Sequence, residues 1–254
     1  MMKIAISGKG GVGKTTLSAC LAYLFKENGS KVLAIDADPD ANLAGALGFK
    51  DVRGIVPISE MKDLVAERTG SDPGTYGTFF AINPKVDDLP DTMAKTVNGL
   101  KFMTLGGVKK GGGGCICPES VLLKSLVMNL VLSRDEAVIL DMEAGLEHLG
   151  RATSTGVDCL IVVCEPGQRS LETARVVKKL SADLRIRRVA VVGNKVRNQG
   201  DRDFIARHVD GLEVLGHIPY ADSIVESDRE GVSVFERSPE AAEACRAIYK
   251  NLVG

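Results

Sequence analysis

The sequence predicts an α/β fold, with a doubly wound, mostly parallel sheet flanked by helices. Short apolar runs rich in β-branched residues recur along the whole chain, and amphipathic helical patterns separate them. Such runs are typical of strands that are buried on both faces, as in a parallel sheet. Their alternation with helices indicates βαβ units with right-handed crossovers, which build an open sheet covered on both sides.

Six apolar runs are expected to form the strands. They are Lys3–Ser7, Lys31–Asp36, Glu136–Asp141, Asp158–Cys164, Arg187–Gly193 and Glu213–Ile218. Helices are expected at Thr15–Asn28, from Pro118 to about Leu132, between Leu171 and Leu184, and from Pro239 onward. Ser238 is expected to cap the last helix, because serine is favoured at the N-cap and proline at the first helical position.

We expect a single domain over residues 1–254, with an irregular insertion at about residues 50–114. The insertion holds scattered prolines and glycines, four consecutive glycines at 111–114, and two possible short strands, Gly77–Ile82 and Leu100–Leu105. It contains no clean linker. A chain of 254 residues is compatible with one large α/β domain.

Charge and composition disfavour several classes of protein. The chain has 32 Lys+Arg against 33 Asp+Glu, a net charge of −1, which disfavours a polybasic nucleic-acid binder. No uncharged apolar run approaches the ~18 residues that a transmembrane helix needs. The six cysteines lack the spacing of a disulfide framework, which indicates a reducing compartment. We therefore expect a cytoplasmic protein that binds neither nucleic acid nor membrane.

A phosphate-binding loop follows the first expected strand and opens a helix. Its sequence fits G-x-x-x-x-G-K-[ST], and its backbone N–H groups are expected to bind phosphates. Lys14 is expected between the β- and γ-phosphates, and the Thr15 hydroxyl on Mg²⁺. The predicted nucleotide-binding residues here are Gly8, Lys9, Gly10, Gly11, Val12, Gly13, Lys14, Thr15 and Thr16.

The first lysine of this loop, Lys9, indicates a family. The sequence from Lys9 to Thr15 is K-G-G-x-G-K-[ST], which resembles the deviant P-loop ATPases. These include the nitrogenase iron protein, the cell-division and partition ATPases, and the arsenite-pump ATPase. The resemblance implies an ATPase that binds ATP and ADP with Mg²⁺. It also implies a homodimer in which Lys9 crosses a two-fold interface to the other subunit's nucleotide.

Carboxylates that follow the strands predict the magnesium site and two switch segments. Asp141 ends an apolar strand in a Walker B pattern and is expected to hold Mg²⁺ through water, beside Thr15. By resemblance, Asp38 of the pair Asp38-Pro39 orients the attacking water and contacts Mg²⁺ through water, so that Lys9, Lys14 and Asp38 are the predicted catalytic residues. Asp36 and Asp40 are either supporting residues or turn residues.

The second switch segment has the family pattern D-x-x-x-G, at Asp141, Glu143 and Gly145. The N–H group of Gly145 is expected to sense the γ-phosphate. Glu143 is a candidate contact for a partner or a metal ion, as are Glu147 and His148. A plain surface position is the alternative for each of these three residues.

Two positions are expected at the nucleotide base. By resemblance, Asn194 hydrogen-bonds the adenine edge, and the backbone at Pro219 lines the base pocket. Arg197 stands where a guanine-reading N-K-x-D motif has its aspartate. This substitution favours ATP over GTP.

Cys115 and Cys117 form a Cys-x-Cys pair after the glycine run. Two thiolates cannot complete a tetrahedral site, and a two-fold dimer supplies the four sulfurs that such a site needs. We therefore predict an intersubunit metal site for Ni²⁺ or Zn²⁺, with two buried or redox-active thiols as the alternative. The other four cysteines are expected in the core: Cys20, Cys159, Cys164 and Cys245.

Taken together, these features resemble the nickel-insertion ATPases that mature carbon monoxide dehydrogenase. The resemblance implies an ATP-dependent metallochaperone whose partner is a client apo-metalloenzyme, namely carbon monoxide dehydrogenase. An iron–sulfur-cluster reductase or assembly ATPase of the same family is one alternative. A positioning or partition ATPase that binds membrane or DNA is another, although the tail Pro239–Gly254 is not a basic amphipathic helix.

Overall fold

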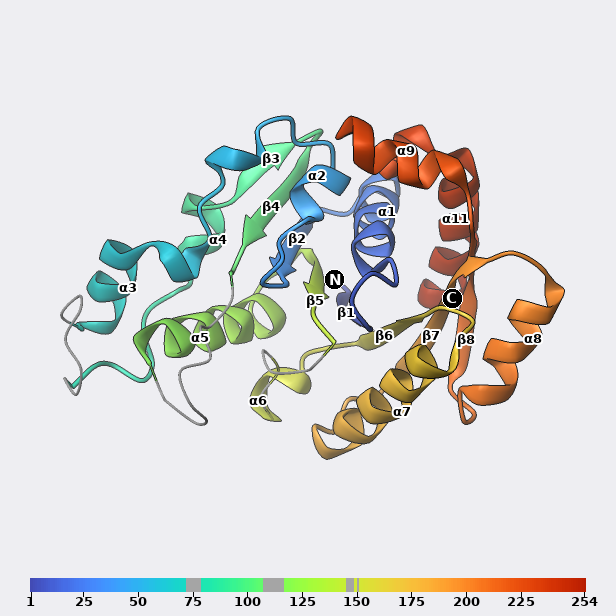
Figure 1. Cartoon of the computed structure of the whole chain (residues 1–254). Coiled ribbons are helices and arrows are strands. Elements are labelled where there is room, and N and C mark those ends of the chain that lie inside the picture. Colours follow the sequence, from blue (N-terminus) through green and yellow to red (C-terminus); the bar gives the residue numbers. More distant parts are fainter. Residues whose placement is uncertain (72–78, 107–116, 145–148, 150) are drawn as a thin grey trace.

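The described residues form one eight-stranded sheet with helices on both faces (Figure 1). The computed structural model describes residues 1–71, 79–106, 117–144, 149 and 151–254. The strands lie in the order β3-β4-β2-β5-β1-β6-β7-β8, and every neighbouring pair is parallel except β3 and β4. The doubly wound, mostly parallel sheet expected from the sequence is therefore confirmed.

The bounds of the elements follow the chain order. The strands are β1 (Lys3–Ser7), β2 (Val32–Ala37), β3 (Lys95–Val97), β4 (Leu100–Thr104), β5 (Ala137–Met142), β6 (Cys159–Cys164), β7 (Val189–Val196) and β8 (Glu213–Pro219). The helices are α1 (Lys14–Glu27), α2 (Leu43–Ala46), α3 (Lys62–Thr69), α4 (Leu89–Thr92), α5 (Pro118–Leu132), α6 (Arg151–Ser154), α7 (Gln168–Asp183), α8 (Gln199–His208), α9 (Asp222–Glu230), α10 (Val234–Arg237) and α11 (Pro239–Val253), with short 3₁₀ turns at Val52–Gly54 and Ile58–Glu60.

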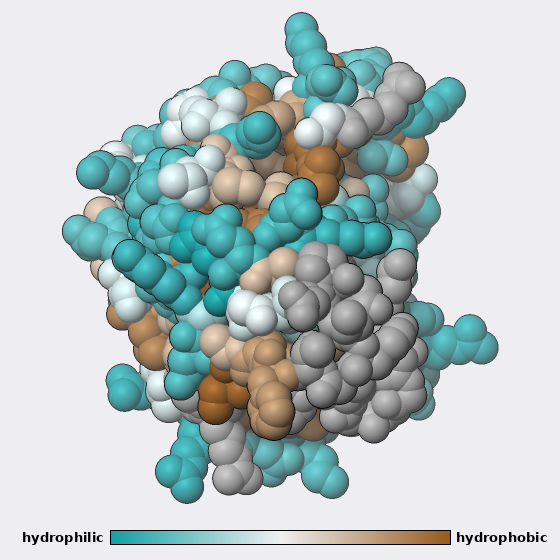
Figure 2. All heavy atoms as spheres, turned by 90° about the vertical axis from the view of Figure 1, so that its left-hand side faces the viewer, coloured by the Kyte–Doolittle hydropathy of each residue, from teal (hydrophilic) through white to brown (hydrophobic). Residues whose placement is uncertain are grey.

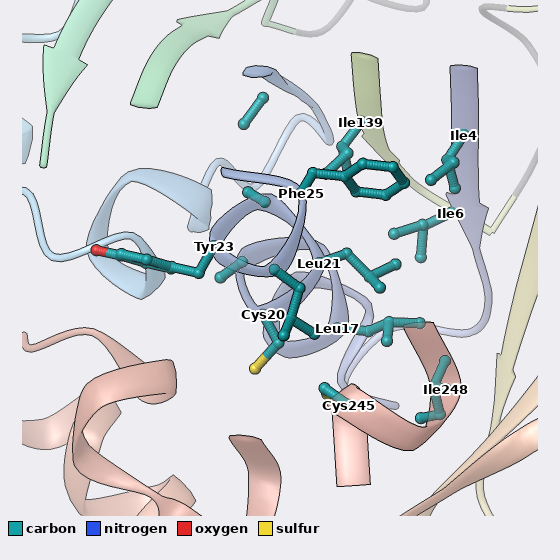
Figure 3. Close-up of a cluster of buried hydrophobic side chains, with 14 of the residues drawn as sticks. Ile4, Ile6, Leu17, Cys20, Leu21, Tyr23, Phe25, Ile139, Cys245 and Ile248 are labelled. Atoms are coloured by element: carbon teal, nitrogen blue, oxygen red, sulfur yellow. The ribbon is translucent and has the colours of Figure 1, made fainter. Parts of the chain in front are cut away.

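Two apolar layers cover the sheet, because successive side chains of a strand point to opposite faces. In β1, Ile4 and Ile6 pack into one layer and Ala5 into the other. The first layer is closed by α1 and α11, and Figure 3 shows side chains of α1 lying between those of β1 and those of α11. The second layer is closed by α5 and α7. All five residues of β1 are buried, which explains its continuous apolar sequence.

The four cysteines expected in the core, Cys20, Cys159, Cys164 and Cys245, are buried there. Figure 3 shows Cys20 of α1 and Cys245 of α11 within the first layer. Burial raises the pKa of the Cys164 thiol to about 11. Such a thiol stays protonated near neutral pH, which suits packing better than metal binding.

The insertion differs in part from its expectation. The strand expected at Leu100–Leu105 is β4, and it pairs with β3, which the sequence reading did not include. The strand expected at Gly77–Ile82 is wrong over residues 79–82, which are not in a strand, while 77 and 78 lie outside the described residues. The physical reason is that β3 already occupies the edge of the sheet beside β4, and the Phe79 side chain is fully exposed.

The helix starts agree with the sequence signals. Ser238 accepts a hydrogen bond from the Ala241 N–H at 3.3 Å, and Pro239 is the first residue of α11. Cys117 has an extended backbone and caps α5, whose first residue is Pro118. Within the described ranges, no helix is long and apolar enough to cross a membrane. The side of the molecule seen in Figure 2 is hydrophilic over most of the visible area, with a smaller hydrophobic region in its lower half.

Candidate nucleotide-binding site

The predicted phosphate loop lies where the strand order of the sheet reverses. The loop joins β1 to α1, and β1 lies between β5 on one side and β6 on the other (Figure 1). The carboxyl ends of strands at such a switch point form the usual ligand crevice of an open α/β sheet. The fold therefore places the loop, the end of β2 and the end of β5 at one edge.

Two glycines of the loop occupy positions that exclude any side chain. A Cβ atom on Gly8 would lie 2.6 Å from the Val163 carbonyl oxygen, and one on Gly13 would lie 1.9 Å from Asn194 Nδ2. Both residues have positive φ, 151° and 96°. Gly10 and Gly11 lie on the exposed side of the loop with open space around them. The loop is thus packed against the sheet on one side and open to a ligand on the other.

Lys14 and its neighbours begin α1 beneath this loop. The Lys14 side chain is buried, and its Nζ lies 3.4 Å from Asp38 Oδ2. Thr15 and Thr16 are half-buried in the first turn of the helix. The predicted first switch segment therefore contacts the loop lysine directly.

Two carboxylates lie side by side behind this ion pair. Asp36 and Asp141 are register partners at the ends of β2 and β5, and both are buried. Burial raises the pKa of Asp36 to about 6, although its oxygens accept hydrogen bonds from the Leu43 N–H at 2.9 Å and the Asp38 N–H at 3.2 Å. Burial, and next the charge of Asp36, raise the pKa of Asp141 to about 7.

The oxygen atoms gathered at this edge are suited to bind a magnesium ion. Both carboxylate oxygens of Asp141 are buried, and within the described residues neither accepts a hydrogen bond of normal geometry. The nearby Thr15 hydroxyl nevertheless lowers the pKa of Asp141. Buried acceptors without donors are costly, and a cation removes that cost. Hydroxyl and carboxylate oxygens are the ligands that Mg²⁺ prefers. The residues that would hold it are Thr15, Asp38 and Asp141, and the ion would neutralise phosphate charge there.

The second switch segment is tied to the strand that precedes the phosphate loop. The Ser7 hydroxyl donates a hydrogen bond to the Glu143 carbonyl oxygen at 2.9 Å. Glu143 itself is half-buried. The expectations for Gly145, Glu147 and His148 fall outside the described residues. The start of this segment therefore lies beside the end of β1.

Asn194 contacts the loop itself, which the sequence reading did not anticipate. Its Nδ2 donates a hydrogen bond to the Val12 carbonyl oxygen at 2.6 Å, and its Oδ1 accepts one from the Lys195 N–H. Strand β7 also continues past the expected end at Gly193, to Val196, with an irregular register against β8. Pro219 is half-buried at the end of β8. The assignment of both residues to the adenine base stays a prediction.

A pocket of about 510 Å³ lies beside the loop, and most of its lining was missed by sequence reasoning. Lys9 lines it, together with Glu165 and the start of α7. Arg197 lies 3.9 Å above the centre of the Tyr220 ring at the same pocket. The signal in the sequence was available, because Glu165, Arg197 and Tyr220 directly follow the ends of β6, β7 and β8.

The predicted cysteine site is only partly visible. Cys117 is half-buried at the start of α5, whereas Cys115 falls outside the described residues. Across the part of the chain that the structure describes, no three His, Cys, Asp or Glu side chains gather as a metal site. The intersubunit metal site therefore stays a prediction.

Comparison with known proteins connects this geometry to a family. The profile of the CobQ/CobB/MinD/ParA nucleotide binding domain matches residues 3–234. The chain is 48% identical over 255 residues to an uncharacterized ATP-binding protein of Methanocaldococcus jannaschii, covering 99% of this chain and 98% of that protein. It is 42% identical over 254 residues to the carbon monoxide dehydrogenase accessory protein CooC of Rhodospirillum rubrum, covering 99% and 96% of the two chains.

Solved structures agree on the fold. The MinD cell division protein of Aquifex aeolicus superposes with a TM-score of 0.70 at 24% identity, covering 100% of this chain and 98% of that chain. A ParA family ATPase of Chlorobium tepidum TLS superposes with a TM-score of 0.69 at 21% identity, with the same coverage. The family expected from the Lys9 signature is confirmed by these matches. The chain therefore belongs to the CobQ/CobB/MinD/ParA nucleotide-binding family and is one of its P-loop ATPases.

Proposed function

We propose that this ATPase is an accessory protein of carbon monoxide dehydrogenase maturation, which delivers a metal ion to the apo-enzyme. The observation that carries the proposal is 42% identity to the accessory protein CooC along nearly the whole of both chains. The cargo is Ni²⁺, or Zn²⁺ as its surrogate, because borderline metal ions share thiolate ligands. ATP-driven association of two copies assembles the site that carries it.

The position of Lys9 supports a dimer around the nucleotide. Lys14 is buried and paired with Asp38, so the loop already contains the lysine that its own phosphates require. Lys9 is exposed and lines the neighbouring pocket with Glu165 and Arg169. A second exposed cation at this edge is suited to the nucleotide of a facing copy, and two-fold symmetry makes that contact reciprocal.

The position of Cys117 supports a shared thiolate site. Cys117 caps a 15-residue helix, and the positive end of a helix dipole favours a thiolate. One chain contributes two sulfurs, from Cys115 and Cys117, and a facing copy contributes two more. Four thiolates complete a tetrahedral site that neither copy completes alone.

The residues of the nucleotide site then couple ATP to this assembly. The loop N–H groups and Lys14 bind the phosphates, which requires Asp38 to release the lysine. Asp38 then orients the attacking water, while bound Mg²⁺ supplies charge neutralisation. The link between Ser7 and the Glu143 backbone gives the second switch segment a fixed starting point. Contacts made only in the presence of the γ-phosphate favour the closed dimer.

Neither nucleic acid nor membrane is part of this proposal. The net charge is −1, and the buried face of α11 packs into the first apolar layer through Ala241, Cys245 and Ile248. A helix that is already docked has no apolar face to offer a bilayer. Pelleting with anionic liposomes or with DNA is expected to leave the protein in the supernatant.

Mass determination and metal analysis of the anaerobically purified protein test the proposal. With a non-hydrolysable ATP analogue and Ni²⁺, we expect dimers that carry one metal ion per two chains. Monomers under saturating analogue, or metal bound independently by each chain, contradict it. Optical and EPR spectra separate the iron–sulfur alternative, because a [4Fe–4S] cluster absorbs broadly and becomes paramagnetic on reduction whereas bound Zn²⁺ does neither.

A further inference from the structure

We propose that Lys195 is a positioning residue for the phosphate loop, which it holds through the carbonyl oxygen of Gly11. The Lys195 Nζ donates a hydrogen bond to this oxygen at 2.8 Å. The same ammonium forms an ion pair with the Glu165 carboxylate. Lys195 therefore links the end of β7 to the tip of the loop, and Glu165 at the end of β6 fixes the direction of the link.

The neighbouring residue, Asn194, provides a second hydrogen bond between β7 and the loop. Asn194 Nδ2 holds the Val12 carbonyl oxygen at 2.6 Å, one peptide further along the loop. Two consecutive loop carbonyls are thus bound by two consecutive residues of β7. This pattern fixes the rotation of the loop peptides as well as their position.

The consequence for the loop follows from the planarity of the trans peptide. Its C=O and N–H groups point in opposite directions, so holding the Gly11 oxygen orients the Val12 N–H away from Lys195. That N–H donates to the Lys9 carbonyl oxygen at 3.3 Å and closes the turn at the tip of the loop. Lys195 thereby stabilises the turn that presents Gly10 and Gly11 on the open side, as an anion site requires.

The backbone of Lys195 adopts an uncommon conformation beside the phosphate loop. Its φ is +56°, in the left-handed region that L residues other than Asn and Asp rarely adopt. It also lies in the stretch of β7 where the register with β8 is irregular. A non-glycine residue kept in this conformation beside a binding loop is a local cost that the contact with the loop offsets.

Lys195 acts on nucleotide binding alone. This role holds whether or not the cysteines bind a metal and whether or not the client is carbon monoxide dehydrogenase. An ordered loop binds the phosphates of ground state and transition state alike, so its loss changes affinity more than turnover. This split distinguishes positioning from a catalytic role.

Lys195→Met is the decisive variant, because it keeps an unbranched apolar side chain but removes the ammonium. We expect the Kd for Mg-ADP in titration calorimetry, and the KM for ATP, to rise on the order of tenfold, with kcat within about twofold of wild type. Lys195→Arg keeps the charge and is expected to restore most of the affinity. Glu165→Gln is expected to shift the Kd in the same direction by a smaller factor.

Lys178→Met is the matched control, since the Lys178 Nζ also donates to a backbone carbonyl oxygen, that of Asp210, at 2.6 Å. Its Kd for Mg-ADP is expected to equal that of wild type. The proposal is overturned if Lys195→Met binds Mg-ADP as wild type does, or if its affinity falls no more than that of Lys178→Met. A fall in Tm with unchanged Kd and KM assigns Lys195 to stability only and also overturns it.

Discussion

Lys14 and Asp38 form an ion pair, with Nζ and Oδ2 3.4 Å apart, at the base of the phosphate loop. The pair joins the residue expected on the phosphates to the residue expected to orient water. We therefore expect a bound nucleotide to compete with Asp38 for the ammonium of Lys14. Such competition would make the first switch segment respond to whether the loop is occupied.

Asp38→Asn separates binding from hydrolysis. The variant removes the negative charge that competes for Lys14, so we expect ADP in the absence of Mg²⁺ to bind at least as tightly as to wild type. It also removes the carboxylate that we expect to orient the attacking water, so kcat is expected to fall on the order of 100-fold. Calorimetry and a phosphate-release assay measure the two effects. Lys14→Ala is the reference, and its nucleotide binding should be lost altogether.

Lys9→Ala tests the two-fold interface without disturbing the loop's own lysine. Lys9 is exposed, so its removal should leave the Kd of the monomer for ATP near that of wild type. Dimerisation by a non-hydrolysable ATP analogue should be lost, as measured by light scattering. Lys50→Ala, which removes another exposed lysine, is the control and should dimerise normally. Normal dimerisation by Lys9→Ala would remove this residue from the interface.

The paired carboxylates predict a pH dependence of stability. The folded-state pKa values of Asp36 and Asp141 are raised to about 6 and about 7, above the ordinary 3.8. The folded protein therefore binds protons more tightly than the unfolded chain, and the stabilisation, complete below about pH 4, is lost as pH rises through about 7. Thermal unfolding in EDTA should show Tm falling between about pH 5 and pH 7.5 from this source.

Two comparisons isolate that effect. Asp141→Asn removes one titrating group at nearly constant shape, so its Tm should fall less steeply over the same pH range. Mg-ADP should also flatten the profile of the wild type, because a cation at this site stabilises the ionised carboxylates. An unchanged slope in Asp141→Asn would place the origin of the pH dependence elsewhere.

Most of the sheet could be predicted because its physics is local. Apolar runs such as Lys3–Ser7 match their strands, and Ser238 and Pro239 mark the start of α11 as serine and proline do elsewhere. The phosphate loop could also be predicted, because its motif follows an expected strand and opens an expected helix. These features depend on neighbours within a few residues.

The features that were missed are a short local hairpin and a contact between residues that are distant in sequence. Strand β3 is three residues long, and its hairpin with β4 turns at Asn98 and Gly99, both with positive φ. So short a strand gives little sequence pattern within the irregular insertion. Likewise, nothing near Lys195 in the sequence indicates that its ammonium reaches Gly11, 184 residues away. Such a link follows only from the order of strands in the sheet.

Cys115 and Cys117 are predicted to bind the metal ion, and of the two only Cys117 lies within the described residues. Replacing both cysteines, Cys115→Ala with Cys117→Ala, should abolish nickel binding by the nucleotide-bound protein, because no other pair supplies thiolates at that position. The Kd for Mg-ADP should remain that of wild type, since Cys117 lies at the start of α5 and not in the phosphate loop. Cys20→Ala with Cys245→Ala is the matched control, because both sulfurs are buried between α1 and α11, and it should keep its nickel. Equal nickel content in the two double variants would refute the thiolate site while leaving the ATPase assignment intact.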